Sequence, residues 1–267
     1  MKITNLRLRQ LEGEMEHPEP FWEERLVRPI DIYPEYKGGG LSGVPERVGR
    51  NRYRMRSIFL EIHTDEGVTG ISGPVSPSEA YIIDTQLRPI LIGKDPLAIE
   101  LLWDQMYRLS IHGRKGNPMM AISAVDCGLW DLKGRYYNAP VYQLLGGKCR
   151  NRIRVYQNPG GATPEQTAEN ALKLKERYGF TAFKTSPLPR DMHEMSWPRV
   201  LREVEAKMSY LRKVLGEDIE IALDPHARIL EPSKAIEMCQ VLAPYRPMFV
   251  EEPLRPENVD TMAEVRA

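Results

Sequence analysis

The sequence IEIALDPH at residues 219–226 is an apolar run that ends in two ionisable side chains, Asp224 and His226. A second run of the same kind, MFVEEP at residues 248–253, ends in a pair of acids that begins with Glu251. Each run has the length and composition of a buried strand. A carboxylate just beyond a buried strand is costly unless it is paired or binds a metal. Two such carboxylates, on strands separated by a helical segment, have the chemistry of oxygen ligands for a hard cation such as Mg²⁺.

The strand-then-helix order repeats throughout the second half of the chain. Further strands are predicted at residues 152–156 and 180–184, and helical periodicity fills the intervals between the strands. Thr163 and Pro164 are typical of the cap and first turn of one of these helices. Alternating strands and helices predict a parallel sheet with helices outside it. In such folds the active site lies at the carboxyl ends of the strands. This sequence places four ionisable residues there: Lys184, Asp224, His226 and Glu251.

The first part of the chain has a different organisation. Strand-like segments begin at Ile3 and at Ser57, and two amphipathic helical patterns follow between residues 97 and 132. Residues 17–50 form a long segment rich in proline, glycine and charge, which predicts a loop that is either mobile or functional. We therefore expect an α+β domain ahead of the α/β domain.

Composition excludes several classes of protein. The 267 residues are 42% hydrophobic and 28% charged, with a formal net charge of zero, which gives no bulk attraction to nucleic acid or to an anionic membrane. The three cysteines are scattered and lack metal-ligand spacing, which favours a reducing compartment. No stretch has the roughly 20 apolar residues of a membrane span, and the N-terminus lacks a signal-peptide core. We expect a cytoplasmic protein with neither nucleic-acid nor membrane partners.

Each ionisable residue at the strand ends also has an ordinary interpretation. Asp224 alone could cap the following turn, His226 could be a surface residue, and Lys184 could be solvated. Together they indicate a site that binds a metal next to a substrate carboxylate. A divalent cation stabilises the dianion formed when the neighbouring carbon loses its proton. The resulting species can be reprotonated, or it can expel a β-hydroxyl with His226 as the general acid and Lys184 as nearby positive charge.

Longer motifs resemble the mandelate racemase branch of the enolase superfamily. Residues 121–135, AISAVDCGLWDLKGR, are similar to the family's domain-junction helix, and residues 140–147, PVYQLLGG, match a pattern that follows it. The resemblance implies an α+β capping domain at residues 1–125 and the first half of a TIM-type (β/α) barrel, about four strands, at residues 126–267. It implies that Asp224 and Glu251 are the first two ligands of Mg²⁺.

Within this branch, Asp224 and His226 followed by Arg228 resemble galactonate dehydratases, in which the corresponding histidine acts as the acid on the departing hydroxyl. The segment HGRKG at residues 112–116 resembles rhamnonate dehydratases instead. Both similarities imply dehydration of an acid sugar. The racemases have Lys-x-Lys where this chain has Lys184, Thr185 and Ser186, which argues against a racemase that uses two bases. An epimerase or racemase of the same branch stays as the alternative.

The family's third metal ligand and its late-strand histidine base would lie beyond Ala267. We therefore expect the 267-residue chain to bind Mg²⁺ weakly and to catalyse little by itself, and a non-catalytic fragment or assembly module is a further alternative.

The family's capping domain covers the barrel mouth, and the intact protein is expected to be a homo-oligomer that acts on a small acid sugar. Candidate sugar contacts in the long loop, each of which could equally be a surface residue, are Trp22, Arg25, Tyr33 and Tyr36.

Overall fold

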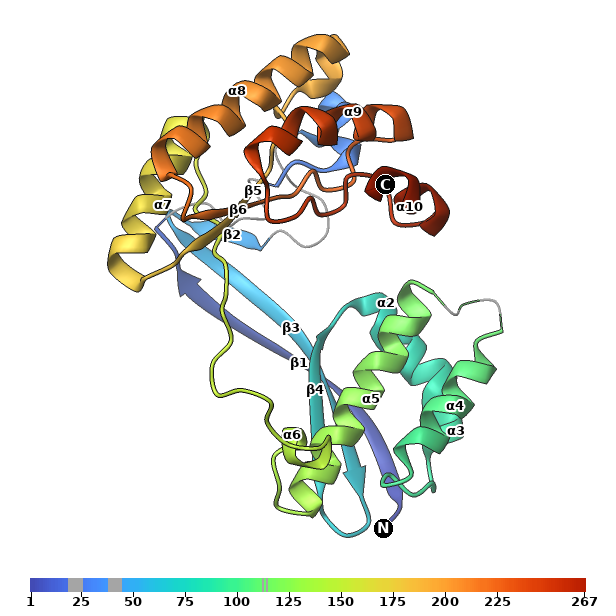
Figure 1. The fold of residues 1–267 in the computed structure, drawn as a ribbon. Coiled ribbons are helices and arrows are strands. Elements are labelled where there is room, and N and C mark those ends of the chain that lie inside the picture. The colour runs from blue at the N-terminus through green and yellow to red at the C-terminus, as the bar shows by residue number, and fades with distance from the viewer. Residues whose placement is uncertain (19–25, 38–44, 112, 114) are drawn as a thin grey trace. The chain divides into compact units, whose positions relative to one another are not determined.

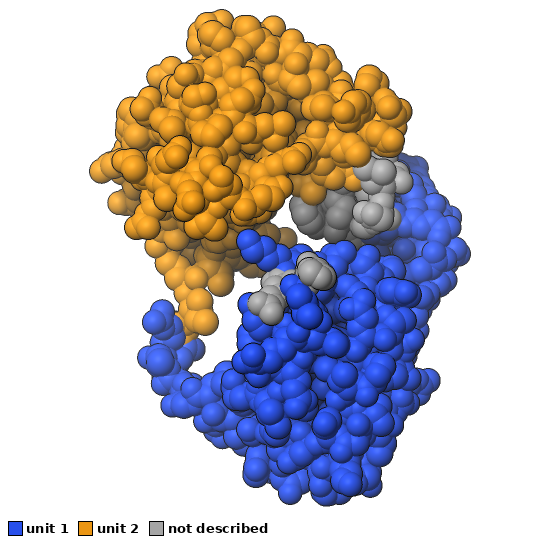
Figure 2. Space-filling model, turned by 90° about the vertical axis from the view of Figure 1, so that its right-hand side faces the viewer, with its two compact units in different colours: residues 1–21, 45–151 blue, residues 22–44, 152–267 orange. Residues whose placement is uncertain are grey.

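The computed structural model describes residues 1–18, 26–37, 45–111, 113 and 115–267 (Figure 1). The chain forms two compact units (Figure 2). Unit 1 contains residues 1–21 and 45–151, and unit 2 contains residues 22–44 and 152–267. The expected boundary between residues 125 and 126 falls inside helix α5 (Asn117–Tyr136), which packs on the sheet and helices of unit 1. The two units instead separate at residues 151 and 152.

Unit 1 is an antiparallel sheet with helices packed against it. Strand β3 (Arg52–Thr64) pairs with β1 (Ile3–Glu16) along its whole length, while its other edge pairs with β2 (Glu46–Gly49) and β4 (Thr69–Val75). The remaining elements are α2 (Pro77–Ile82), the π-helix η3 (Ile83–Leu87), α3 (Arg88–Leu91), α4 (Ile99–Leu109), α5 and α6 (Val141–Leu144). This arrangement confirms the expected α+β domain.

The core of unit 1 requires a close approach between β4 and α5. Apolar side chains of α5, among them Ile122, Val125 and Leu129, are fully buried in this core. A Cβ atom on Gly70 would lie 2.2 Å from the carbonyl oxygen of Gly128 and 2.7 Å from the Cβ of Leu132. Glycine at position 70 therefore sets how closely the helix packs on the strand.

Unit 2 has the predicted order of strands and helices. Strand β5 (Ala182–Thr185) pairs in parallel with β6 (Glu220–Leu223). Helices α7 (Pro164–Tyr178), α8 (Trp197–Leu215), α9 (Pro232–Leu242) and α10 (Val259–Arg266) pack on one another in sequence order. Short 3-10 helices also occur: η1 (Pro29–Ile32), η2 (Pro34–Tyr36), η4 (Met192–Glu194) and η5 (Ala243–Tyr245).

The two outer strands predicted for unit 2 are reduced to single parallel bridges. Gln157 pairs with Phe183 next to β5, and Val250 pairs with Leu223 next to β6. The expected strand at residues 152–156 is not formed. Within the described residues, the backbone of Gln157 hydrogen-bonds to other backbone groups only at its β5 side, from its N–H to Ala182 O (3.1 Å) and from Lys184 N–H to its carbonyl (2.9 Å). The spatial order across unit 2 is nevertheless that of four consecutive parallel strands.

Local sequence explains the helix ends of unit 2. The Thr163 hydroxyl accepts a hydrogen bond from the Gln166 N–H (3.3 Å), which confirms the predicted cap of α7. Gly179 ends the same helix in the left-handed conformation, with φ of 77°. Among the described helices, none has the combination of length and apolar character that a membrane crossing needs.

We predict that Gly70→Ala lowers the free energy of unfolding of unit 1 by about 1–3 kcal/mol, because the added methyl group overpacks the β4–α5 contact. Urea denaturation followed by far-UV circular dichroism measures this loss. Gly13→Ala on β1 is the matched control, since among the described residues no atom beyond its two chain neighbours lies within 4 Å of its added Cβ. Equal stability of the two variants would contradict the packing argument.

Candidate active site

Three neighbouring parallel segments of unit 2 bring the predicted ionisable residues together. Lys184 lies on β5, Asp224 directly follows β6, and Glu251 follows the bridge formed by Val250. Because the segments are parallel and adjacent, their carboxyl ends lie at one edge of the sheet. The edge is fixed by backbone hydrogen bonds from Asp224 N–H to Thr185 O (3.0 Å) and from Glu251 N–H to Leu223 O (2.8 Å).

The Lys184 ammonium joins the two carboxylates. Its Nζ donates to Asp224 Oδ2 at 2.7 Å and to Glu251 Oε2 at 3.0 Å. The same Nζ lies 5.8 Å from the ring centroid of Tyr156, within cation–π range. Burial alone would lower the pKa of Lys184, but its hydrogen bonds to Asp224 and Glu251 raise the pKa to about 12. Lys184 is therefore a cation at neutral pH and neutralises part of the acidic edge.

Asp224 is the most buried member of the cluster, with 3% of its surface exposed. Its Oδ1 accepts a hydrogen bond from the His226 backbone N–H (3.0 Å), and its Oδ2 lies 3.1 Å from His226 Nε2. Burial alone would raise the pKa of the Asp224 carboxyl, but the hydrogen bonds from His226 and Lys184 lower it to about 2. The carboxylate is thus ionised and already aligned by three donors.

The turn that carries His226 has an unusual backbone. His226 and Ala227 have φ of 56° and 51°, and Glu252, in the facing loop, has φ of 42°. Residues other than glycine pay an energetic cost in this left-handed region, of about 1–2 kcal/mol each. The Ala227 N–H donates to Glu252 O (3.1 Å), so the two strained loops support each other. The turn directs the His226 imidazole back onto Asp224.

The donor set fits a hard divalent cation, although it is incomplete. Asp224 and Glu251 supply carboxylate oxygens that converge on one point, now contacted by the Lys184 ammonium. No group of three or more His, Cys, Asp or Glu side chains with metal-binding geometry occurs in the part of the chain that the structure describes. The two carboxylates at adjacent strand ends supply fewer oxygen ligands than the six or more that such a cation takes.

Two protein-family models match the chain. The model for the mandelate racemase / muconate lactonizing enzyme N-terminal domain matches residues 49–146, and the enolase C-terminal domain-like model matches residues 166–267. The chain belongs to the mandelate racemase and muconate lactonizing enzyme branch of the enolase superfamily. The fold expected from the resemblance, a capping domain followed by a barrel-type domain, is confirmed.

Known relatives in this superfamily include enzymes named for acid sugars. A D-galactonate dehydratase of Ralstonia pickettii is 36% identical over 222 residues, which are 80% of this chain and 57% of the relative. An Agrobacterium radiobacter enolase, provisionally described as a galactarate dehydratase and bound to Na and L-malate, superimposes with a TM-score of 0.75 at 32% identity, over 100% of this chain and 58% of that structure. A Pantoea ananatis enolase with bound D-gluconate and Mg gives a TM-score of 0.68 at 27% identity, over 79% and 59%. The chain thus spans about three-fifths of the length of these relatives.

The structure describes two of the four candidate sugar contacts predicted in the long loop. Trp22 and Arg25 lie outside the described residues, as do His112 and Arg114 of the HGRKG segment. Tyr33 and Tyr36 lie in the η1–η2 segment, which belongs to unit 2, and their rings pack edge to face at 6.3 Å. Both are exposed, and this ring contact does not involve the Lys184 cluster. The segment is joined to η4 by an ion pair between Lys37 Nζ and Glu194 Oε1 (2.5 Å).

Two further cations border the site, and sequence reasoning assigned neither of them a role. Lys207, on α8, donates to Ser186 O (2.7 Å), and Arg228 donates to Ser186 Oγ (3.0 Å). Burial and the charge of Arg228 lower the pKa of Lys207 to about 8, while burial and the charge of Arg190 lower that of Arg228 to about 10. The only sequence signal was the place of Arg228 in the Asp-x-His-x-Arg motif, and Lys207 gave none.

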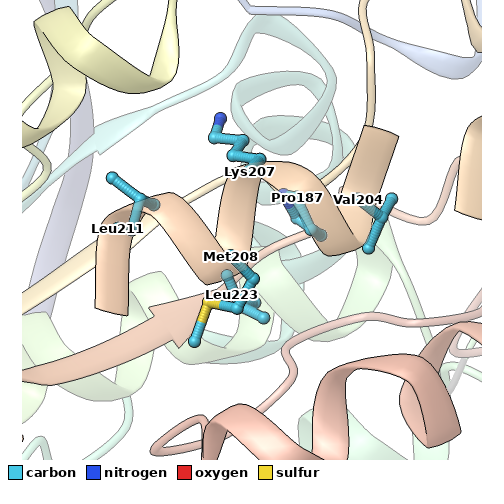
Figure 3. A pocket seen from close by; sticks show the side chains of 6 residues that line it. All are labelled: Pro187, Val204, Lys207, Met208, Leu211 and Leu223. Atoms are coloured by element: carbon cyan, nitrogen blue, oxygen red, sulfur yellow. The ribbon is translucent and has the colours of Figure 1, made fainter. Parts of the chain in front are cut away.

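Lys207 also borders a small apolar space behind the site (Figure 3). In Figure 3 the Met208 and Leu223 side chains lie together beneath α8, and the Lys207 side chain extends away from them. The remaining lining residues are Pro187, Val204 and Leu211. This space lies in the core packing between α8 and β6, and its mostly apolar lining offers few polar groups. The ionisable residues of the candidate site lie instead at the strand ends.

We predict that Asp224→Asn lowers the free energy of unfolding of the metal-free chain by about 2 kcal/mol at neutral pH, from the drop of the Asp224 pKa below 3.8 to about 2. Because the folded state has the lower pKa, this stabilisation is complete above about pH 5 and disappears as the pH falls through about 2. Urea denaturation of unit 2 in EDTA across this range measures it. Asp218→Asn, at an exposed turn of the same unit, is the control. A neutral-pH stability equal to that of the parent chain would show that the ion pair contributes nothing.

Proposed function

We propose that the intact protein is a Mg²⁺-dependent dehydratase of an acid sugar, an aldonate such as galactonate. The observation that carries this proposal is the convergence of Asp224 and Glu251 on one cation position, with Lys184 and His226 in contact with the same carboxylate. The similarity to a D-galactonate dehydratase supports the substrate class. The proposal concerns the whole protein, of which this chain supplies the capping domain and part of the barrel. A cytoplasmic location and a homo-oligomeric state stay predictions.

Asp224 and Glu251 would hold the metal ion, since both present ionised oxygens at the carboxyl edge of the sheet. Bound there, Mg²⁺ would supply the positive charge that stabilises the dianion formed when the carbon next to the substrate carboxylate loses its proton. Lys184 carries a full positive charge at the same position and would attract the substrate carboxylate. Asp224 would also keep His226 oriented through its contacts with the His226 backbone N–H and imidazole.

His226 would act as the general acid. Dehydration removes a proton from the carbon next to the carboxylate and breaks the C–O bond at the following carbon, and the departing hydroxide needs a proton to leave as water. His226 lies at the strand ends with its imidazole Nε2 3.1 Å from Asp224 Oδ2, and from this position it would donate the proton to the departing hydroxyl. The enol that remains tautomerises to a 2-keto-3-deoxy acid. The family resemblance places the base that removes the first proton on a later strand than those of this chain.

Ser186 separates this proposal from a racemase that uses two bases. A lysine two positions after Lys184 would supply the second base, whereas the Ser186 hydroxyl is held by Arg228 at 3.0 Å and has no basic character at neutral pH. The position two residues after Lys184 therefore offers no lysine that could serve as the second base of such a racemase.

We predict that the intact protein, supplied with Mg²⁺, converts at least one aldonic or aldaric acid to its 2-keto-3-deoxy product. A screen of acid sugars, read out as the semicarbazone of the product, tests this, and EDTA should abolish the signal until Mg²⁺ is restored. Absence of turnover with every acid, from protein shown to be folded, would refute the proposal. Deuterium entering the carbon next to the carboxylate without loss of water would indicate an epimerase instead.

We predict that His226→Asn leaves Mg²⁺ affinity intact and lowers dehydration by about 10²–10⁴-fold, the usual contribution of a general acid. Proton exchange next to the carboxylate should persist, because it does not require the acid. Calorimetric titration with Mg²⁺ and turnover of the substrate found by the screen measure the two effects. His63→Asn is the control, since His63 lies on β3 and contacts Thr69 (3.1 Å). Full activity of His226→Asn would show that another group is the acid.

A further inference from the structure

We propose that Arg228 is the positioning residue for His226, because it joins the segments that follow β5 and β6 into one rigid support. Its guanidinium donates from Nε to Pro225 O (3.2 Å), from one terminal nitrogen to Pro189 O (2.9 Å), and from the other to Ser186 Oγ (3.0 Å) and Leu188 O (3.2 Å). The inference rests on the proposed function only for the chemical role of His226.

Three of the four acceptors of Arg228 lie in a segment that has few backbone N–H groups of its own with which to form hydrogen bonds. Residues 186–189 read SPLP, and the two prolines have no N–H group. Side-chain cations replace the absent backbone bonds: Arg228 contacts Ser186, Leu188 and Pro189, and Lys207 contacts the Ser186 carbonyl from the other element, α8. The segment after β5 is therefore held from both sides by charged donors.

The turn on the other side of Arg228 needs such a support. His226 and Ala227 are consecutive residues in the left-handed region, with φ of 56° and 51°. Such a conformation persists only when the surrounding contacts impose it. Arg228 directly follows these residues and returns to the carbonyl of Pro225, which directly precedes them. It thereby closes the turn that holds His226 Nε2 at 3.1 Å from Asp224 Oδ2.

The hydrogen bonds of Arg228 favour a role in positioning His226 over a role in binding the substrate. A guanidinium has five N–H groups, and the bonds to Pro225, Pro189, Ser186 and Leu188 engage four of them. All four acceptors are uncharged oxygens of the protein. The charged groups that interact with Arg228 include Arg190, Lys207, Asp31 and Asp224. A substrate anion would have to displace bonds that already hold the two segments together.

The test reads the environment of His226 in the metal-free chain by NMR. The chain is labelled at the histidine ring carbon Cε1, and the His226 resonance, one of five, is assigned with His226→Asn. The displacement of this resonance from its position in the urea-unfolded chain is the measure. Arg228→Met should lose at least half of the displacement. Arg228→Lys should lose less than Arg228→Met because it keeps the charge, but it should still lose some because it reaches fewer acceptors. Arg199→Met, which removes an exposed pair with Glu203 on α8, should lose none.

Ala227→Gly gives an independent rescue. Glycine accepts the left-handed conformation without cost, so Ala227→Gly combined with Arg228→Met should recover part of the displacement, and an absence of recovery would overturn the role of the strained turn.

A folded Arg228→Met chain with the full displacement would overturn the proposal, and if that variant does not fold, the same result with Arg228→Lys would do so. The readout needs neither metal nor substrate, so its failure would leave the proposed dehydratase standing, and failure of the acid-sugar screen would leave this result standing.

Discussion

The contact of one ammonium with two carboxylates organises the whole strand-end edge of unit 2. Lys184 comes from β5, Asp224 from the end of β6 and Glu251 from the next segment, so one charged group spans three consecutive segments of the sheet. Asp224 is almost fully buried, and a buried carboxylate is tolerated only with partners that replace water. Lys184 and His226 are those partners. The cost of burying Asp224 is thus what requires the other ionisable residues to gather around it.

The same contact makes metal binding and the ion pair interdependent. A divalent cation held by Asp224 and Glu251 would use oxygen lone pairs that now accept hydrogen bonds from Lys184. Two positive groups at one position repel each other, so on the proposed function Lys184 would turn from the two carboxylates toward the carboxylate of the substrate. The strained turn at His226 and Ala227 and the bonds of Arg228 would meanwhile keep the acid in place. One residue would then respond to metal and substrate, while its neighbours stay fixed.

The fold of unit 2 follows from patterns that local physics explains. Apolar runs with a period suited to buried strands predicted β5 and β6, and Thr163 and Gly179 marked the ends of α7. The grouping of Lys184, Asp224, His226 and Glu251 was predictable because parallel strands end at a common edge. The prediction of a strand at residues 152–156 was wrong. A strand needs hydrogen-bonded partners along its backbone, and in this region the pairing with β5 is limited to a single bridge at Gln157.

Other features depend on tertiary contacts that no short pattern encodes. The division of the chain at residues 151 and 152 depends on how α5 packs against β4, through the small residues Gly70 and Gly128. Residues 26–37 belong to unit 2 although strand β1, which precedes them in the chain, belongs to unit 1; this assignment depends on contacts distant in sequence, such as Lys37 with Glu194. Sequence reasoning gave Lys207 and Arg228 no role for the same reason, because both contact oxygen atoms of the SPLP segment that no short sequence pattern connects to them.

The most direct test of the shared cation site is a crystal structure of the intact protein grown with Mn²⁺, which replaces Mg²⁺ and gives an anomalous signal. The account predicts one anomalous peak bonded to oxygens of both Asp224 and Glu251, with the Lys184 ammonium moved away from them. An edge without such a peak, in which Lys184 still bridges the two carboxylates, would contradict it.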